Sequence, residues 1–306
     1  IYEKTSRLMT HIPVLLEESV DLLVHNPNGV YIDGTFGRGG HSKKILSKLS
    51  SKGSLIAFDK DLEAVNFAKS TISDKRFSIF HGTLNSKSIK HLTYGVDGIL
   101  FDFGLCSTQL DDAERGFSFG KAGPLDMRMN QESGISAMEW LSKATEKEIA
   151  DVLWKYGEEK HSKSIARLIT NTQQRQPITS TAKLAGLIEE KFPRVGRKHP
   201  ATKTFQAIRI YINDEIEDLK INLLTADHLL SSGGIIVTIA FHSLEDREIK
   251  EFFKPSRTEV HKDIPLNPII KKKYNIITNK LKPTPEEILN NQRSRSAILT
   301  AYQKNE

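Results

Sequence analysis

The segment of this chain with the clearest capacity to bind a ligand is a glycine-rich turn at residues 33–41, which reads DGTFGRGGH. It follows residues 30–33, which read as a short apolar strand, and precedes residues 42–49, where apolar residues recur at helical spacing. Glycines in such a turn let the backbone bend sharply and approach a ligand closely. Gly37, Gly39 and Gly40 are therefore the first candidate binding residues.

Asp59 supplies the second half of this candidate site. It lies 22 residues after Gly37, at the end of a second expected strand, residues 54–59. A carboxylate there can accept hydrogen bonds from both hydroxyls of a ribose, which suits NAD and S-adenosylmethionine alike. A dinucleotide fold would have a third glycine where this chain has Ser42. The turn is more similar to the first motif of class I methyltransferases, whose ligand carries no phosphates.

A third candidate group follows the fourth expected strand, residues 96–103. Asp102 can hydrogen-bond an amino group and orient its lone pair toward a methyl donor, so it is the first candidate catalytic residue. Cys106 offers a different chemistry, covalent attack on C5 of a cytosine. Such a thiolate needs a helix N-terminus or a cation beside it, and we expect neither; the chain also has no second cysteine. We favour an unreactive Cys106 and keep the covalent C5 enzyme as an alternative.

Phe241 and His242 follow the most apolar run of the chain, residues 235–241, which we expect to be a buried central strand. Phe241 can stack on an exposed base, and His242 is a second candidate catalytic residue. A single histidine at a strand terminus is more often structural, so both interpretations stay open for His242.

Short strands and amphipathic helices must position these residues. Strands expected at 30–33, 54–59, 77–80 and 96–103 alternate with helices at 42–49 and 62–69. This rhythm implies parallel pairing with right-handed crossovers. Residues 244–253 read as a further helix, and residues 297–302 can form a closing strand. The predicted fold class is α/β, a doubly wound, Rossmann-like class I methyltransferase sheet.

The alternation stops between about residues 110 and 209, where we expect helices alone. They fall at 137–156, where Thr145 and Glu148 can start a new helix through a capping box, at 162–170 and at 181–192. Apolar residues recurring from Phe205 to Leu223 predict one long helix leading back to the sheet, and Gly233-Gly234 is expected to end the helical region that follows. We therefore predict a discontinuous methyltransferase domain, residues 1–110 and 210–306, interrupted by a helical insertion, residues 111–209.

Positive charge gathers in two segments of a chain whose net charge is +6. Residues 191–209 hold lysines and arginines without an acid, and a second cluster covers residues 271–282, followed by Arg293 and Arg295. Such clusters are either a solvated basic face without a ligand or contacts to polyphosphate, and we favour contact with polyphosphate.

The composition bounds the class of protein. With 306 residues, 38% of them hydrophobic, the chain can bury a full core, and no run approaches the roughly 20 apolar residues of a membrane span. No apolar run follows Lys4 and Arg7, so we expect no secretory signal. The single cysteine excludes a disulfide framework and a cysteine-based zinc site. We expect a cytoplasmic protein with no membrane attachment, and we identify no metal ligands.

Seven segments together resemble one protein family along almost the whole chain. They are HIPVLL at residues 11–16, GGH at 39–41, QLDDAERGFSF at 109–119, GPLDMRM at 123–129, GRKHPAT at 196–202, FHSLEDR at 241–247 and RSRSA at 293–297. The chain is similar in these segments to the RsmH, or MraW, family of bacterial 16S rRNA cytosine-N4 methyltransferases.

This resemblance implies methyl transfer from S-adenosylmethionine to the exocyclic N4 of a decoding-centre cytidine, with 16S rRNA or the small ribosomal subunit as partner. The family's cofactor contacts match Gly39, Gly40, His41, Asp59, Asp102 and Gln109 here. Leu84 stands where the family usually has a phenylalanine that contacts the cofactor, and Cys106-Ser107-Thr108 replaces serine-serine-proline. We therefore expect a weaker adenine contact and an altered acceptor loop.

The helical insertion is the expected RNA platform. Its candidate RNA contacts are Arg115, Arg128, Arg197, Lys198, His199 and Lys203, joined outside it by Phe241, Arg293 and Arg295. A non-catalytic RNA-binding or ribosome-assembly protein remains the second alternative. The oligomeric state stays open, with a homodimer among the options.

Overall fold

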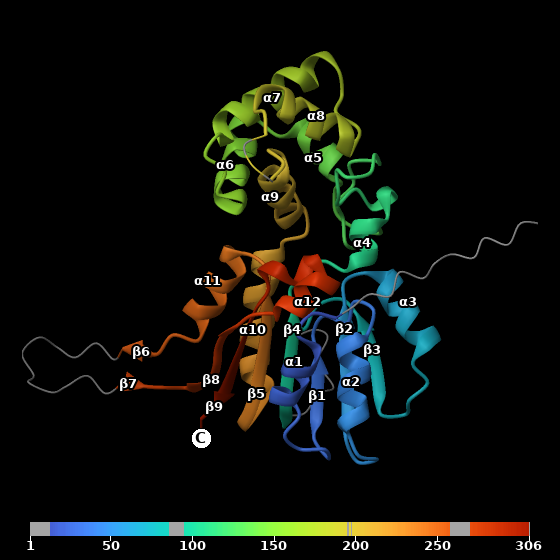
Figure 1. The fold of residues 1–306 in the computed structure, drawn as a ribbon, viewed down its shortest axis with the longest axis vertical. Helices are drawn as coiled ribbons and strands as arrows, with labels where there is room; N and C mark the ends of the chain where they lie inside the picture. Colours follow the sequence, from blue (N-terminus) through green and yellow to red (C-terminus); the bar gives the residue numbers. More distant parts are fainter. Residues whose placement is uncertain (1–12, 86–94, 195, 197, 258–269, 306) are drawn as a thin grey trace, which may run out of the picture. The chain divides into compact units, whose positions relative to one another are not determined.

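The structure is a computed structural model that describes residues 13–85, 95–194, 196, 198–257 and 270–305. The chain divides into two compact units (Figure 1). One consists of residues 1–104 and 220–306 and is called here the sheet unit; the other, residues 105–219, is called the helical unit.

A seven-stranded sheet forms the centre of the sheet unit. Its strand order is β3-β2-β1-β4-β5-β9-β8. The strands are β1 (Val30–Asp33), β2 (Ser54–Asp59), β3 (Phe77–His81), β4 (Val96–Asp102), β5 (Leu230–Ala240), β8 (Tyr274–Leu281) and β9 (Ile298–Lys304). The first five are parallel, and β9 is antiparallel to both of its neighbours. This arrangement confirms the predicted α/β class and its Rossmann-like sheet. A separate two-stranded sheet pairs β6 (Ser256–Arg257) with β7 (Ile270–Lys271).

Helices cover this sheet, and in Figure 1 α1 and α2 lie in front of it. The helices of this unit are α1 (Leu16–Leu23), α2 (Gly40–Lys48), α3 (Leu62–Thr71), α11 (Ser243–Phe252), α12 (Pro285–Asn290) and the short 3₁₀ helix η2 (Gln292–Ser296), together with residues 220–229 of α10 (Glu215–Leu229). Val20 and Leu23 of α1 join Ile45 of α2 and Val237 of β5 in one buried cluster. At Gly98 of β4 a Cβ would lie 2.9 Å from both Leu23 and Tyr31, so the sheet packs tightly at that point.

The helical unit has its own hydrophobic core, which includes Trp140, Ile149, Ile165, Leu184 and Phe205. Its helices are α4 (Ser107–Asp111), the 3₁₀ helix η1 (Ala113–Arg115), α5 (Ala137–Lys143), α6 (Glu146–Gly157), α7 (Ser162–Arg175), α8 (Thr181–Lys191) and α9 (Thr202–Ile212). The predicted capping box is confirmed: the Thr145 hydroxyl accepts from Glu148 N at 3.3 Å, and the Glu148 carboxylate accepts from Thr145 N at 2.7 Å. The described residues of this unit contain no strand, only one isolated bridge between Pro124 and Ser180.

The expectation of one long helix from Phe205 to Leu223 is wrong. The chain forms α9 and then α10 (Glu215–Leu229), with a break at Asn213 and at Asp214, whose φ is +50°. The Asn213 side chain causes the break because it binds another segment: its amide donates to Met127 O at 2.7 Å, and its Oδ1 accepts from Met129 N at 2.6 Å. The expected end at Gly233-Gly234 is also wrong, since β5 already begins at Leu230.

None of the helices in the described part of the chain has both the length and the apolar character that a membrane span requires.

Two glycines of the helical unit give a matched test of its packing. Gly186 is exposed inside α8, and a Cβ there would meet nothing within 4 Å. Because glycine within a helix costs roughly 0.5–1 kcal/mol relative to alanine, we expect Gly186→Ala to stabilise the unit by about that amount. At Gly157 a Cβ would lie 2.7 Å from Lys203 O, so Gly157→Ala should destabilise the unit by about 1–3 kcal/mol. Hydrogen exchange of amides in α6–α9 measures both, and changes of the same sign would contradict the packing described.

Candidate functional site

The carboxylate of Asp59 holds the glycine loop at the end of β2. Its Oδ2 accepts a hydrogen bond from Gly37 N at 2.7 Å, and its Oδ1 accepts one from Asp61 N at 2.8 Å. Each carboxylate oxygen has a second lone pair, so the group can accept further hydrogen bonds from a ligand diol. The structure therefore brings Asp59 and Gly37 together, as a ribose site on this edge of the sheet requires.

Burial raises the pKa of the Asp59 carboxyl to about 6, against the lowering effect of the N–H groups of Asp61 and Gly37. The nearby carboxylates of Asp61 and Asp33 raise its pKa further. Asp59 is therefore an acid whose charge changes close to neutral pH.

The three glycines of the loop serve different purposes. Gly37 has φ +58°, and a Cβ there would meet nothing within 4 Å, so open space lies beside this part of the backbone. At Gly39, with φ +74°, a Cβ would lie 2.5 Å from the ring of Phe36, and at Gly40 it would lie 2.0 Å from Pro13. Gly39 and Gly40 are thus needed for packing within the unit, whereas Gly37 leaves room for a ligand.

A chain of hydrogen bonds links the start of this loop to Asp102 at the end of β4. The buried carboxylate of Asp33 accepts from Ser42 Oγ at 2.6 Å and from Thr35 N at 3.1 Å. The hydroxyl of Thr35 accepts in turn from Asp102 N at 2.6 Å. Burial raises the pKa of Asp33, and Ser42 and His41 oppose this rise. Asp102 is thereby fixed through its backbone to the glycine loop.

His41, in the first turn of α2, lies beside the same carboxylates. Its Nε2 is 3.1 Å from the carbonyl oxygen of Val14, and because a carbonyl only accepts, Nε2 carries a proton. Its Nδ1 lies 3.9 Å from Asp102 Oδ2. The imidazole is buried, so it positions the segment before α1 against Asp102. Its contact with a cofactor remains a prediction.

Two further predicted cofactor contacts have different surroundings. Leu84 follows β3 and is completely buried, with 0% of its surface exposed. Gln109 is buried in the helical unit, where its Oε1 accepts from Cys106 N at 3.1 Å and closes the first turn of α4. Both assignments stay predictions based on the resemblance.

Phe241 lies next to the segment that follows Asp102. A Cβ added to Gly104 would be 2.6 Å from the Phe241 ring, so the ring lies directly against the Gly104 backbone. Phe103 N donates to Ile239 O at 3.0 Å, which continues the pairing of β4 with β5 to this point. Phe241 is only half-buried, which leaves part of its ring surface for a base.

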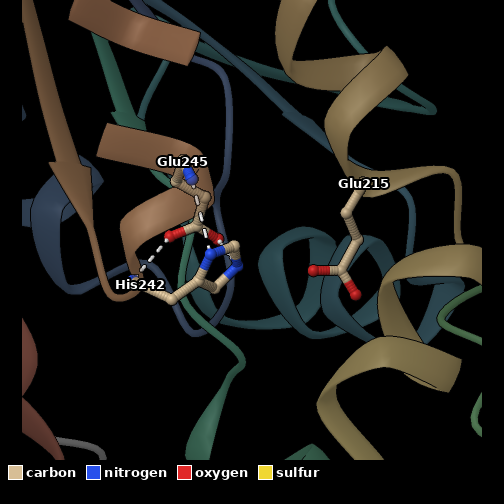
Figure 2. A group of neighbouring side chains, drawn as sticks. All are labelled: Glu215, His242 and Glu245. Carbon is tan, nitrogen blue, oxygen red and sulfur yellow. Dashed lines mark hydrogen bonds and ion pairs between the residues drawn. The ribbon is translucent and has the colours of Figure 1, made fainter. Parts of the chain in front are cut away.

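His242 is the N-cap of α11 (Figure 2). Its Nδ1 accepts from Glu245 N at 3.4 Å, while Glu245 Oε2 accepts from Phe241 N at 2.7 Å and from His242 N at 3.2 Å. Its Nε2 lies 2.9 Å from Glu245 Oε1 but without the alignment of a hydrogen bond. Glu215, also drawn in Figure 2, belongs to the helical unit, where both of its oxygens accept from Arg209 at 2.8 Å. The structure gives His242 a capping role, and its catalytic role remains a prediction.

The position of Cys106 contradicts one expectation from the sequence. We expected no helix N-terminus beside it, yet it is the N-cap of α4, with its Sγ 3.2 Å from Thr108 Oγ1. The helix has only five residues, so its dipole is small and stabilises a thiolate at Cys106 only weakly.

The candidate RNA contacts of the helical unit differ in accessibility. Arg115 is buried, and its guanidinium donates to the carbonyl oxygens of Arg128 and Met129 at 3.2 and 2.8 Å, so it stabilises the fold. Arg128 forms a two-point ion pair with Asp126, at 2.8 Å for each contact. Arg197 lies outside the described residues.

Three other candidates lie near the start of α9. The His199 ring packs against Phe119, with ring centroids 4.5 Å apart, and its Nδ1 accepts from Ala201 N. Lys198 and Lys203 are exposed, although the Lys203 ammonium donates to Glu158 O at 2.8 Å. Arg293 and Arg295 are also exposed, on η2 of the sheet unit. The exposed side chains among the candidates are therefore those of Lys198, Lys203, Arg293 and Arg295.

Sequence reasoning missed Thr35, Ser42 and Glu245 as residues that position the site. Thr35 and Ser42 stand within or beside the glycine motif, but hydroxyl residues in loops are too common to single out without their partners. Glu245 did give a signal, since it lies three residues after a possible N-cap, the spacing of a capping box.

The residues of the sheet unit fit an adenosine ligand. Gly37 leaves space beside its backbone, and the Asp59 oxygens retain acceptor capacity. Asp102 is held at the end of β4, the strand that pairs with β1. All three lie at the carboxyl ends of parallel strands, where open α/β sheets bind their ligands.

The raised pKa of Asp59 predicts that ligand affinity depends on pH. The ionised carboxylate accepts both ribose hydroxyls, whereas protonation removes acceptor capacity, so affinity for S-adenosylmethionine should fall as the pH drops through about 6. Well below that value we expect a loss of about tenfold per pH unit. Calorimetric titration from pH 8 to pH 5 measures it. Asp59→Asn should bind weakly at pH 8 and show little pH dependence; an unchanged pH profile in this variant would remove Asp59 as the titrating group.

Capping and catalysis by His242 can be separated with two variants. His242→Ala removes the side-chain acceptor, so we expect α11 to lose about 1 kcal/mol of stability, while asparagine is a good N-cap and His242→Asn should preserve it. Because His242 caps a helix, we expect His242→Asn also to retain methyl transfer. Thermal unfolding and transfer of labelled methyl groups measure the two properties. Loss of transfer in His242→Asn with intact stability would instead assign His242 to catalysis.

The sequence matches a family model described as the MraW methylase family over residues 8–305. A relative named Ribosomal RNA small subunit methyltransferase H, from Alteromonas mediterranea, is 47% identical, with 96% of this chain and 97% of that protein covered. A protein of the same name from Buchnera aphidicola is also 47% identical, with 95% and 98% covered. Among solved structures, a putative rRNA-methylase from Clostridium thermocellum is 14% identical, with a TM-score of 0.46 and coverage of 96% and 98%.

The family model spans nearly all of the sequence, and the two relatives exceed 40% identity over almost their full length. The chain therefore belongs to the MraW methylase family.

Proposed function

We propose that this protein transfers a methyl group from S-adenosylmethionine to N4 of a decoding-centre cytidine in 16S rRNA. The observation that carries the proposal is the near-complete match to proteins named for methylation of small-subunit ribosomal RNA. The choice of N4, and of the decoding centre, comes from the motif resemblance along the chain. The site on the sheet unit is compatible with this chemistry.

The residues that would hold the cofactor lie at the ends of β1, β2 and β4. Asp59 would accept hydrogen bonds from the ribose, the open space beside Gly37 would receive the ligand, and Asp102 would act on the acceptor amine. Leu84 and Gln109 are further proposed contacts. S-adenosylmethionine supplies an electrophilic methyl group on a sulfonium sulfur.

Asp102 is the proposed catalytic residue. The exocyclic amine of cytosine is a weak nucleophile because its lone pair is conjugated with the ring. A carboxylate that accepts a hydrogen bond from this amine orients the lone pair and stabilises the positive charge that develops on nitrogen. The bond from Asp102 N to Thr35 Oγ1 fixes the backbone that carries this carboxylate. A strong base is not needed before transfer, because the amine proton is lost more readily afterward.

The target base must leave its stack to reach such a site. Phe241, half-buried against Gly104, offers a ring face for the displaced cytosine. Lys198 and Lys203 of the helical unit, with Arg293 and Arg295 of the sheet unit, are the proposed phosphate contacts. Affinity for RNA should therefore fall steeply as the salt concentration rises.

The test is a pair of substitutions at Asp102 and Cys106. We expect Asp102→Ala to reduce methyl transfer by at least two orders of magnitude while the protein stays folded, because the oriented amine and its charge stabilisation are lost. Cys106→Ser should remain active, since N4 transfer needs no thiolate. Mass spectrometry of 16S rRNA nucleosides from cells carrying each variant measures both.

Several outcomes would overturn parts of this proposal. If the wild type methylates C5 and Cys106→Ser is inactive, the covalent alternative would be supported. Near-normal transfer by Asp102→Ala would remove Asp102 from the mechanism. Purified protein that binds rRNA but not S-adenosylmethionine would identify a non-catalytic assembly protein.

A further inference from the structure

The positive charge of the protein is not concentrated in its helical unit. Residues 105–219 contain 17 lysines and arginines and 17 aspartates and glutamates, so this unit has no net charge. Residues 270–304 contain eight lysines and arginines and only two acids. An excess equal to the net charge of the whole chain, +6, is therefore found in the segment that forms β8, α12, η2 and β9.

Four cations of this segment are exposed and have no ion-pair partner among the described residues. They are Lys272, Lys280, Lys282 and Arg295. By contrast, the ammonium of Lys273 lies 2.5 Å from Asp227, and that of Lys304 donates to the carbonyl oxygens of Asp227 and Leu230. The four exposed cations are free to bind an anionic partner.

Three of these cations lie on or beside β8, which is an edge strand of the sheet: Lys272 precedes it, Lys280 lies within it and Lys282 follows it. The register places the end of β8 level with the candidate active site: Leu281 pairs with Leu299, Leu299 with Ile239, and Ile239 with Asp102. The start of β8 lies level with the other end of β9, where Tyr274 pairs with Lys304. The bulges shorten β8, so that it lies opposite only the five residue steps of β9 from Leu299 to Lys304. With a rise of about 3.3 Å per residue, β8 therefore runs roughly 17 Å away from the catalytic edge.

A cavity of about 210 Å³ lies at the start of β8. Its walls include Phe252, Pro255 and Tyr274 together with Lys254 and Lys272. This volume is below the roughly 300 Å³ at which sites for drug-sized ligands begin, so it suits a smaller group such as one nucleotide unit.

The charge of the one acid in the cavity wall, Asp227, is balanced by an ion pair. Asp227 accepts from the Tyr274 hydroxyl at 2.6 Å and pairs with Lys273, and these groups hold the pKa of Asp227 below its usual range despite burial. The phenol of Tyr274 stays protonated, because burial and the bond to Asp227 raise its pKa. Lys254 pairs with Glu251 at 3.2 Å, but both side chains are exposed, so a phosphate can compete for Lys254. The cavity therefore favours an anion.

We propose that the edge of β8 and this cavity form a track for the single-stranded RNA backbone that flanks the target nucleotide. The proposal rests on the proposed function, because it extends the contact with the same RNA. Lys280 and Lys282 contact phosphates near the catalytic edge, and Lys272 contacts a phosphate at the cavity, where one base stacks on Phe252. The catalytic unit itself thus supplies much of the electrostatic attraction.

Lysines and bulges on an edge strand also discourage pairing with another sheet. β8 has register shifts between Ile276 and Thr278 and between Thr278 and Leu281, and Lys280 has φ +58°. This protective role accounts for a lysine on the strand, but it requires neither the adjoining cavity nor cations at both ends. The two roles differ in their effect on RNA affinity, which makes them separable.

The test compares two triple variants of the full-length protein. The track variant carries Lys272→Ala, Lys280→Ala and Lys282→Ala. The control carries Lys52→Ala, Lys69→Ala and Lys75→Ala, three exposed lysines around β2, α3 and β3 at the other side of the sheet, with the same change in charge. Binding to a single-stranded fragment of 16S rRNA is titrated from 50 to 200 mM salt, and S-adenosylmethionine binding confirms the fold.

We expect the track variant to bind RNA about tenfold or more weakly near 150 mM salt. Its slope of log affinity against log salt should be less steep by about 2, since each lost phosphate contact on a single strand contributes about 0.7. The control should match the wild type. Phe252→Ala should weaken binding about fivefold or more with an unchanged slope, because stacking involves no counterions.

The outcomes separate the track from the proposed function. Wild-type protein that methylates 16S rRNA, with track and control variants of equal affinity and slope, would overturn the track alone. Self-association of the track variant with unchanged RNA affinity would assign the lysines to edge protection. Wild-type protein that neither binds nor methylates rRNA would overturn the proposed function and the track together.

Discussion

The hydrogen bond from Gly37 N to the Asp59 carboxylate is the interaction on which the candidate site depends. It joins the loop after β1 to the end of β2, and with φ +58° at Gly37 it sets the course of the backbone where a ligand would lie. A hydrogen bond to a charged group contributes roughly 1.5–3 kcal/mol, so the loop is held firmly in the ionised state. The cost is a partly buried carboxylate with a pKa raised to about 6. Loop geometry and protonation are therefore linked through one side chain.

The parallel sheet explains why the other polar groups gather near this bond. Asp33, Asp59 and Asp102 end β1, β2 and β4, and parallel strands bring their carboxyl ends to one edge. Three acids so close together repel one another, and the structure compensates with the hydroxyl of Ser42, nearby N–H groups and the imidazole of His41. Asp102 is positioned mainly through its backbone, by Thr35. Its carboxylate can then serve the substrate while the main chain stays fixed.

The sequence predicted those parts of the molecule that depend on local pattern. Strands β1 and β2 have the bounds expected from their apolar runs, and the capping box at Thr145 starts α6 as expected. These features depend on neighbours a few residues away. The expected helix from Phe205 to Leu223 failed because the Asn213 side chain binds Met127 and Met129, which are more than 80 residues distant in the sequence. Strand β8 was missed because its bulges disturb the two-residue alternation.

The same limit applies to the site. The glycine turn and Asp59 were recognisable from type and spacing, and the structure joins them directly. Arg115 and Arg128 looked like phosphate ligands, yet burial of one and the ion pair of the other depend on tertiary contacts that a single sequence does not display. The cap formed by Cys106 depends on a helix of only five residues, too short to give a periodic signal. A positive residue in the sequence therefore does not identify a phosphate contact until its structural partners are known.

The discontinuity of the sheet unit has a consequence for biosynthesis. The central strand β5 and the edge pair β8–β9 are translated only after the whole helical unit, so a ribosome-bound chain that ends before residue 220 has β4 without its inner neighbour. The nascent sheet then exposes backbone groups and the apolar faces of α1 that later cover β5. The helical unit encloses its own core and can mature first. A helical unit that folds early would connect the first strands of the sheet to the later ones through a compact domain. Strand β5 could then pair with β4 soon after β5 leaves the ribosome.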